Sequence, residues 1–490
     1  MRYVLSLSVV LLLGGCASLR IADSGDGDAG DGTHTPDDPG SRPGGGASDD
    51  DDDDVTLPDG GKAPDAATKD ASASEAGAND AKVESIAVGE NVACVVFEKG
   101  VMRCWGSYLL AGGGSTSTPK PSPIPIRADD GGGFLTGVAE VAASYRHACA
   151  RLLSGNFACW GFNNEYQLGD FTRNNGQDTQ VTPFARIVKD SSAAGPKLTG
   201  PSNLAGIGRV SGGVAHSAAV INGAVLTWGY VSGGPNGPLG RGNPSQSDAI
   251  APKPVLAVGG QPAPADDRLL GVKTVSLGRH HGCGALQNNT VACWGDNASG
   301  KLGIGSGVAV TDGRPRLVSV PDGTGLLGVS TGDTSSCAVT GMGRVRCWGQ
   351  NNLGQSGKDP VGGSQQDASL DVKVSGGQAL ARVIDVGVGN GYACALTEAG
   401  AGGKVYCWGT GTGSVLGDGT SAARAVAAPI ASALAPAKVD LEGARLLAVG
   451  ESSACVVIGD RDVRCWGQGP IGEAGKSSSS SSIPRRVDDL

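Results

Sequence analysis

The sequence contains few of the residues from which catalytic, metal and nucleic-acid sites are usually built. Aromatic residues make up 4% of the 490 residues, and only 5 residues are histidine. No two cysteines have the short spacing of a zinc site, and histidine partners at metal-ligand spacing are missing as well. The sequence also lacks a basic stripe with interleaved aromatic residues, which argues against nucleic-acid binding. We therefore expect no cofactor and no nucleic-acid partner.

The few tryptophans mark a repeat. All 7 are followed by glycine and 6 are preceded by cysteine, and successive tryptophans are 55, 68, 66, 54, 60 and 58 residues apart. A unit of this length that recurs along a chain is typical of propeller blades or solenoid turns. We assign a structural role in the repeat to Trp105, Trp160, Trp228, Trp294, Trp348, Trp408 and Trp466.

A second cysteine usually stands ten residues before each Cys-Trp-Gly. The stretch between the two alternates apolar with small or polar residues around a turn, which predicts a hairpin of two half-buried strands. The third unit has Ala218 and Thr227 instead, so both cysteines are missing together. Joint absence is what a covalent pair predicts, and facing positions on antiparallel strands lie within disulfide reach.

We therefore predict six disulfides in an oxidising compartment. The alternative is that cysteine serves as a small buried apolar residue. The predicted pairs are Cys94 with Cys104, Cys149 with Cys159, Cys283 with Cys293, Cys337 with Cys347, Cys394 with Cys407, and Cys455 with Cys465.

The thirteenth cysteine, Cys16, ends a segment that resembles a bacterial lipoprotein signal peptide. One basic residue is followed by an apolar run from Val4 to Leu13 and by small residues directly before the cysteine. The apolar run is too short to span a bilayer. The resemblance implies that Cys16 is lipidated and anchors the protein in the bacterial cell envelope. No acidic retention signal follows Cys16, so we expect the outer membrane.

The next segment has the composition of a disordered tether. Residues 17–81 carry 17 acidic and 4 basic side chains and almost no large apolar ones, so they cannot form a core. A flexible chain of this length spans roughly 40 to 50 Å. Residues 82–490 are nearly neutral, with 34 basic and 31 acidic residues. We predict a signal peptide at 1–15, a lipidated, disordered tether at 16–81, and a folded domain at 82–490.

The repeated unit resembles the regulator of chromosome condensation repeat. Its pattern is glycine, then histidine or a substitute, Cys-Ala, a turn, Cys-Trp-Gly and Asn-x-x-Gly-x-x-Gly, which is clearest at Asn163–Gly169, Asn297–Gly303 and Asn351–Gly357. The resemblance covers residues 82–490 and implies an all-β fold, a seven-bladed β-propeller of antiparallel blades. The first unit has no Pro-x-Val strand before it, and the chain ends with one, Ile483 to Val487. We expect this C-terminal strand to close the propeller by completing the N-terminal blade.

Proteins of this family have unrelated functions, so the fold gives little information on activity. Members include nuclear exchange factors for small GTPases, parts of ubiquitin ligases, a plant ultraviolet-B photoreceptor and a secreted bacterial β-lactamase inhibitor. Export excludes the first two kinds. A photoreceptor would need clustered tryptophans outside the repeat positions, and this sequence has none.

Three of the histidines occupy one repeat position. His147, His216 and His281 lie two residues before the first cysteine position of consecutive units, so they should form an arc. Imidazoles that converge on one point could bind a transition metal. Equivalent residues on neighbouring blades diverge unless they lie near the axis, and the resemblance implies packing and hydrogen bonding instead. We assign no metal ligands.

Two motif matches point to catalysis but fit the repeat better. Gly328–Gly332 has the form of a hydrolase nucleophile motif, yet it occupies a blade-strand position without a following helix. Residues 472–477 look like a phosphate loop, yet Pro470 stands where the first glycine is required. We predict no catalytic residue and no enzymatic activity.

Two long inserts, Asp170 to Asn203 and Gly233 to Asp267, are either binding loops or neutral insertions. We expect a monomeric, envelope-anchored, noncatalytic platform that binds an unidentified protein. One alternative is an inhibitor of an envelope or secreted hydrolase such as a β-lactamase. The other is a carbohydrate-binding or enzymatic propeller, which a cluster of acidic residues would favour.

Overall fold

The computed structural model describes residues 81–490 apart from several loop positions. Residues 1–80 lie outside the described part of the chain. They include the predicted signal peptide, Cys16 and most of the predicted tether. The positions left out after residue 80 are 91, 107–119, 125, 129–132, 146, 171–180, 189–209, 231–236, 243, 245–249, 260–266, 322–324, 360–363, 366–369, 433–438, 470–479 and 489.

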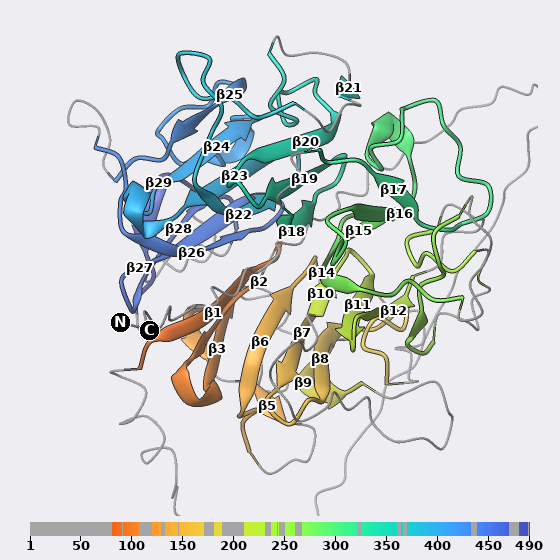
Figure 1. The fold of residues 1–490 in the computed structure, drawn as a ribbon. Coiled ribbons are helices and arrows are strands. Elements are labelled where there is room, and N and C mark those ends of the chain that lie inside the picture. The colour runs from red at the N-terminus through yellow and green to blue at the C-terminus, as the bar shows by residue number, and fades with distance from the viewer. Residues whose placement is uncertain are drawn as a thin grey trace, which may run out of the picture. The chain divides into compact units, whose positions relative to one another are not determined.

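Seven antiparallel sheets follow one another along the chain and surround a common axis (Figure 1). Within each sheet four strands are hydrogen-bonded in chain order, so each repeat unit forms one blade. The first strands of neighbouring blades contact each other, which places them nearest the axis. The all-β, seven-bladed propeller predicted from the sequence is confirmed.

The first three blades contain β1 to β13. β5 (Arg127–Ala128) adds a short parallel strand to the second blade, beside β9. The strands of the three blades are, in order, β1 (Val83–Val88), β2 (Val92–Phe97), β3 (Met102–Gly106) and β4 (Lys120–Ile124); β6 (Val138–Ala143), β7 (His147–Leu152), β8 (Phe157–Phe162) and β9 (Val181–Ile187); β10 (Val210–Gly212), β11 (His216–Ile221), β12 (Ala224–Gly229) and β13 (Lys253–Pro254).

The last four blades repeat this arrangement. Their strands are β14 (Val272–Leu277), β15 (His281–Leu286), β16 (Val291–Gly295) and β17 (Arg316–Val318); β18 (Leu326–Thr331), β19 (Ser335–Thr340), β20 (Val345–Gln350) and β21 (Ser364–Gln365); β22 (Val383–Val388), β23 (Tyr392–Thr397), β24 (Val405–Gly409) and β25 (Arg424–Pro429); β26 (Ala444–Val449), β27 (Ser453–Ile458), β28 (Asp462–Gly467) and β29 (Ser481–Arg486).

The helical segments of the described chain are short and lie in loops. None of them is long and apolar enough to cross a membrane. They are the 3-10 turns η1 (Glu98–Gly100), η2 (Ala298–Gly300), η3 (Ala399–Ala401) and η4 (Thr412–Ser414).

The alternating strand directions give the propeller two different faces. The loops from first to second strand and from third to fourth strand emerge on one face, which we call the loop face. The turns from second to third strand emerge on the opposite face, together with the connections between blades. We call this the hairpin face.

The hydrophobic core is divided among the blade junctions. Seven clusters of buried apolar side chains each combine residues of two neighbouring blades, and each contains one repeat tryptophan. Trp228 of blade three, for example, packs with Leu168 and Val188 of blade two. All seven indoles are 0% exposed. Truncating such a side chain to alanine costs about 3 to 5 kcal/mol, so each junction depends on its tryptophan.

Glycine lets the first strands converge at the axis. A Cβ on Gly332 would lie 2.6 Å from the carbonyl oxygen of Gly389 in the next blade. No ordinary side chain tolerates this approach, which explains the glycine five residues before the first cysteine position. Ser144 is the one departure from that glycine, and the next blade places Gly212 against it.

The closure predicted from the sequence is wrong, as the pairing of the fourth, outer strands shows. β29 pairs with β28 of its own blade and not with the N-terminal blade. Likewise β13 pairs with β12, and β17 pairs with β16. Each fourth strand thus belongs to the blade whose tryptophan precedes it in the chain. The Pro-x-Val strand folds back along the Cys-Trp-Gly strand just before it, so the first unit is complete without a strand from the C-terminus.

The ring is instead closed by packing and hydrogen bonds between blades seven and one. The Val83 N–H donates to the Asp460 carbonyl at 2.9 Å, as Val272 donates to Gly223 between blades three and four at 3.0 Å. The guanidinium of Arg445 donates to the carbonyls of both Val83 and Asp460. Figure 1 shows the first blade, in orange, beside the last, in blue.

Replacing Arg445 tests this closure. Arg445→Met keeps the apolar stem but removes the guanidinium donor to the Val83 carbonyl of blade one and one of the two donors to the Asp460 carbonyl of blade seven, so we expect the free energy of unfolding to fall by about 1 to 3 kcal/mol. Chemical denaturation under oxidising conditions measures it. Leu327→Met, at the same strand position in blade five, is the control and should be nearly neutral. Equal stability of the two variants would contradict the role of Arg445.

Candidate functional site

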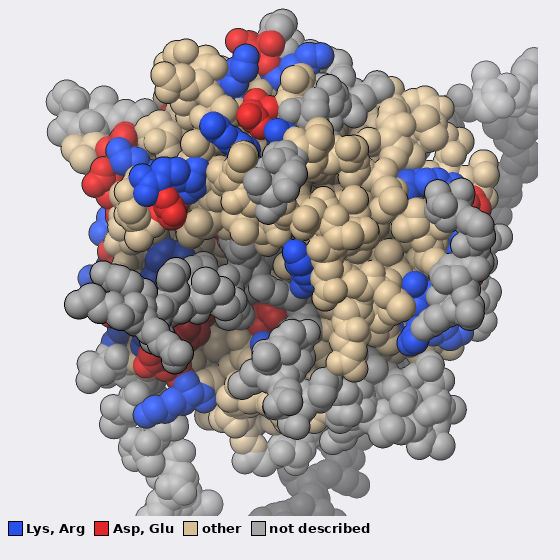
Figure 2. All heavy atoms as spheres, in the orientation of Figure 1, with Lys and Arg blue, Asp and Glu red and all other residues tan. Residues whose placement is uncertain are grey.

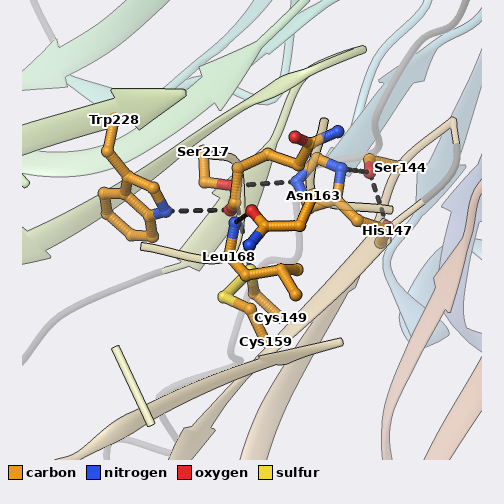
Figure 3. The surroundings of a disulfide bond; sticks show 9 residues. Ser144, His147, Cys149, Cys159, Asn163, Leu168, Ser217 and Trp228 are labelled. Carbon is orange, nitrogen blue, oxygen red and sulfur yellow. Dashed lines mark hydrogen bonds between the residues drawn. A yellow bond between two sulfur atoms is a disulfide. The ribbon is translucent and has the colours of Figure 1, made fainter. Parts of the chain in front are cut away.

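The structure joins all six predicted cysteine pairs as disulfides, with Cα–Cα distances of 4.0 to 4.1 Å. The members of each pair face each other on the second and third strands, as Cys149 and Cys159 do in blade two (Figure 3). Each of the twelve side chains is at most 1% exposed. Buried sulfur of this kind is inert toward exchange, so the disulfides are structural.

In the third blade Ala218 and Thr227 stand where the other blades have a disulfide, and Thr227 makes hydrogen bonds of its own. Ala218 faces Thr227 across a two-residue turn whose residues, Asn222 and Gly223, both have positive φ. The Thr227 hydroxyl donates to the Leu239 carbonyl at 2.7 Å and accepts from Arg241 at 3.1 Å. This hydroxyl ties the third strand to the loop that follows. The sequence showed only a missing cysteine at this position.

At five junctions a hydrogen bond from the tryptophan indole joins a blade to the preceding blade. The Trp228 indole N–H donates to the carbonyl of Gln167 in blade two at 2.9 Å (Figure 3). The same bond recurs at four other junctions, with distances of 2.9 to 3.1 Å, from Trp294 to Pro238, Trp348 to Lys301, Trp408 to Gln355, and Trp466 to Val415. One side chain thus fills the core of a junction and fixes the register between two blades.

The Asn-x-x-Gly-x-x-Gly segment shapes the acceptor of this bond. The Asn163 amide oxygen accepts the Leu168 N–H at 3.0 Å (Figure 3). This bond curves the loop around the Gln167 carbonyl, which accepts the Trp228 N–H. A Cβ on Gly169, whose φ is 65°, would lie 2.8 Å from the Trp228 indole nitrogen. The motif is therefore a cradle for the tryptophan of the next blade.

The histidine position supplies a second set of bonds between blades. His147 is hydrogen-bonded through Nδ1 to Ser144 at 2.7 Å and through Nε2 to Ser217 of the next blade at 2.8 Å (Figure 3). His281 reaches Ser336 of the next blade at 2.9 Å. The arc therefore binds neighbouring blades in sequence. Among the described residues, no three histidine, cysteine or carboxylate groups are placed to share a metal ion.

His216 is the exception in this arc. It is 0% exposed, and neither ring nitrogen has a hydrogen-bond partner among the residues that the structure describes. The next blade has Gly282 where its counterparts carry Ser217 and Ser336. A Cβ at Gly282 would lie 2.7 Å from both Leu277 and the Trp294 ring, so serine does not fit there.

Burial keeps these histidines neutral. Desolvation lowers the pKa of His147 to about 3. It does the same for His216, with smaller contributions from the nearby His280 and His147. Desolvation also holds the pKa of His281 well below its usual value.

The hydrolase-like motif is a structural strand. Ser330 lies in β18 and is 0% exposed, and its hydroxyl accepts the Val388 N–H of the next blade at 3.1 Å. A buried hydroxyl used in this way cannot attack a substrate. The phosphate-loop match at 472–477 lies outside the described residues.

Several charged side chains on the loop face have polar partners in neighbouring blades. Arg279 of blade four lies 3.2 Å from Asp333 of blade five, and Asn390 donates to Glu451 of blade seven at 3.2 Å. Figure 2 shows acidic and basic side chains beside one another on the left of the view, with mostly other residues in the middle. Mixed charge of this kind does not attract a polyanion.

Each of the two long inserts is divided by a strand. β9 lies inside the first and β13 inside the second, so part of each insert belongs to the loop face and part to the connection on the hairpin face. Most of their remaining residues lie outside the described ranges.

Comparison with known proteins identifies the repeat. Three segments match the family model of the regulator of chromosome condensation (RCC1) repeat: residues 138–167, 272–301 and 328–355. Each begins in a first strand, and each ends at the residue whose carbonyl accepts the next blade's tryptophan. The repeat type predicted from the sequence is confirmed for blades two, four and five.

Similar proteins come from several eukaryotes. The chain is 26% identical over 323 residues to the ultraviolet-B receptor UVR8 of Arabidopsis thaliana, covering 65% of this chain and 62% of that protein. It is 26% identical over 308 residues to the human E3 ubiquitin-protein ligase HERC2, covering 61% of this chain but 5% of the ligase.

Two solved structures show the same fold. Human WBSCR16 has a TM-score of 0.56 at 20% identity, covering 81% of this chain and 94% of that one. Prp20p from Saccharomyces cerevisiae has a TM-score of 0.53 at 19% identity, covering 75% and 80%. At these identities the likeness establishes the propeller fold alone.

The bond network of blade three can be tested at Thr227. Thr227→Val keeps the shape but leaves the Leu239 carbonyl without its donor, so we expect a loss of about 1 to 2 kcal/mol in the free energy of unfolding. Thr227→Ser retains the hydroxyl and should lose much less. Guanidinium titrations of both variants provide the measurement. A valine variant as stable as the serine variant would show that the hydroxyl does not stabilise blade three.

The buried histidines make stability depend on pH. Below about pH 6.5 they take up protons in the unfolded chain, whereas His147 and His216 stay neutral in the folded chain until about pH 3. Stability should therefore fall as the pH falls from 6.5 toward 3, by about 1.4 kcal/mol per pH unit for each histidine. Chemical denaturation at pH 7, 6 and 5 measures the slope.

His216→Phe is the informative variant because His216 has no hydrogen bond to lose and Tyr392 occupies the equivalent position in blade six. It should lower the slope by one histidine's share and leave stability at pH 7 nearly unchanged. His147→Phe should instead destabilise the protein at pH 7, since Ser144 and Ser217 lose their partner. Identical slopes for the wild type and His216→Phe would refute the assignment.

Proposed function

We propose that this protein is a monomeric, envelope-anchored, noncatalytic propeller that binds another protein through its loop face. The observation that carries the proposal is how the repeat uses its chemically capable side chains. The paired cysteines, the histidine arc and Ser330 are all buried and serve the blades or their junctions. What varies from blade to blade is the set of loops.

The scaffold suits a binding role because it is rigid. Each blade is held to its neighbours by an apolar cluster, and at five junctions by a described tryptophan bond. Loops on a rigid frame lose little conformational entropy on binding. The mixed charge of residues 82–490 favours a protein over a nucleic acid as partner.

The attachment of the tether also favours the loop face. Residues 82 and 83 lie at the hairpin face, where the Lys82 carbonyl accepts from Glu98 and the Val83 N–H donates to Asp460. The loop face is the face opposite the start of the folded domain, which supports it as the binding face.

Affinity capture from the native envelope tests the proposal. The full chain with a C-terminal tag is recovered from the cells that make it, and a reduced, unfolded sample is the control. We expect one protein near one-to-one with the folded form only. Recovery of a hydrolase whose activity the propeller suppresses would establish the inhibitor. No protein enriched over the control would refute a protein-binding platform.

Lipidation is checked in the same cells. Cys16→Ser should release the protein from the membrane fraction and abolish labelling by a fatty-acid probe. Unchanged membrane association of Cys16→Ser would overturn the proposed anchor while leaving the binding role intact.

A further inference from the structure

We propose that blade three opens locally, by separating from blade four, while the disulfide-tied blades of the propeller stay folded. This inference goes beyond the proposed function and does not depend on it. It is carried by two ties that other junctions have and that are both missing between blades three and four. They are the disulfide and the hydrogen bond of the histidine position.

In the other blades the disulfide takes part in the junction with the next blade. Cys149 and Cys159 of blade two belong to the apolar cluster that this blade shares with blade three. The five other cysteine pairs likewise belong to the cluster between their own blade and the next one. A disulfide therefore ties the two central strands of a blade together and also packs in the junction.

The cluster between blades three and four contains no disulfide, because blade three has no cysteine. Ala218 belongs to this cluster and faces Thr227 on β12. The Thr227 hydroxyl donates to the Leu239 carbonyl in the following loop, so it does not tie β12 to β11. A disulfide of this spacing lowers the entropy of the open hairpin, so its absence favours local opening by a factor on the order of a hundred.

The histidine of blade three also makes no bond across this junction. His147 reaches Ser217 of the next blade at 2.8 Å, and His281 reaches Ser336 of the next blade at 2.9 Å. His216 lies between them in the arc and is fully buried, yet both of its ring nitrogens lack a partner among the described residues. Opening returns such a group to water, so His216 favours the open state.

Of the junctions in the described part of the chain, only this one lacks both ties. Ser335 of blade five and Ser453 of blade seven also have a buried hydroxyl without a partner. Both of these blades keep their disulfide in the junction with the next blade. Blade one has Val92 at the histidine position, which is apolar and needs no partner.

The remaining contacts between blades three and four are of the kinds that other junctions also have. Hydrogen bonds of 2.9 to 3.0 Å run from the Trp294 indole to Pro238, from the Leu277 N–H to the Ser211 hydroxyl, and from the Val272 N–H to Gly223. In a repeat protein the stability adds up from blades and their junctions, and the unit with the fewest ties opens with the lowest free energy. Blade three is that unit.

Hydrogen exchange of the full chain at pH 7, with the disulfides reduced only after quenching, tests the opening. It compares β11 and β12 of blade three with β15 and β16 of blade four, and with β1 and β27 at the junction of the two chain ends. After correction for intrinsic rates, we expect β11 and β12 to exchange on the order of a hundredfold faster than the others. Equal rates in blades three and four, or fastest exchange in β1 and β27, would overturn the inference. Neither result concerns partner binding, so the proposed function is tested separately.

A disulfide introduced into blade three is the second test. Ala218 and Thr227 face each other as the cysteines of the other blades do, so Ala218→Cys with Thr227→Cys should form a bond, which the intact mass reports. Exchange of β11 and β12 should then slow by a factor on the order of a hundred.

Cys283→Ala with Cys293→Thr is the matched control, because it gives blade four the residue pair of blade three. Exchange of β15 and β16 should rise by a similar factor, while blade three is unchanged. Exchange in blade three that stays fast after the new disulfide has formed would show that it does not arise from opening of this blade, and would overturn the inference.

Discussion

The hydrogen bond from a tryptophan indole to a carbonyl of the preceding blade is the interaction on which this structure depends. A blade touches only its two neighbours, so the stability of the ring is the sum of similar junctions. Each junction needs apolar burial and a fixed register. At five junctions the indole supplies both, because its ring fills the cluster while its N–H donates to one defined carbonyl. The Asn-x-x-Gly-x-x-Gly loop holds that carbonyl in position. Trp160 fills its cluster in the same way, but its N–H has no partner among the described residues.

The same arrangement explains where the other polar residues are used. A histidine or serine near the axis finds its partner one repeat later, as His147 does in Ser217. A change in one blade is therefore felt in the blade before it. In blade three, His216 has no hydrogen-bond partner because blade four has Gly282 at the facing position. The same blade has Ala218 and Thr227 in place of the disulfide, and the Thr227 hydroxyl bonds to the loop that follows. Departures from the repeat thus accumulate in blade three, between the two long inserts.

A ring also has to be closed, and here the closure uses the same kinds of contact as other junctions, an apolar cluster and a backbone hydrogen bond between blades. The Val83 bond to Asp460 repeats a bond found between blades three and four, and Arg445 adds donors that span the two ends of the chain. Because an apolar cluster holds each blade to its neighbours and hydrogen bonds reinforce most junctions, the frame restricts the loops that it carries. Such a frame can hold Tyr166 in a conformation that its side chain disfavours.

The sequence by itself determined the local features. The number of blades, the hairpins and the partners of the cysteines follow from residues that lie ten or thirteen positions apart, since facing positions in a hairpin are set by its turn. The seven-bladed fold followed once the repeat resembled a known one. Buried histidines and tryptophans could be assigned to packing for the same reason.

Only the tertiary structure decided what depends on neighbouring blades. Pairing of the C-terminal strand with either the first or the last blade is compatible with the same sequence pattern, and the prediction chose the wrong one. The partners of His147 and Trp228 lie 70 and 61 positions away, beyond the reach of any local pattern. The backbone of Tyr166 is left-handed because the junction with blade three holds its loop, which residue type alone does not reveal.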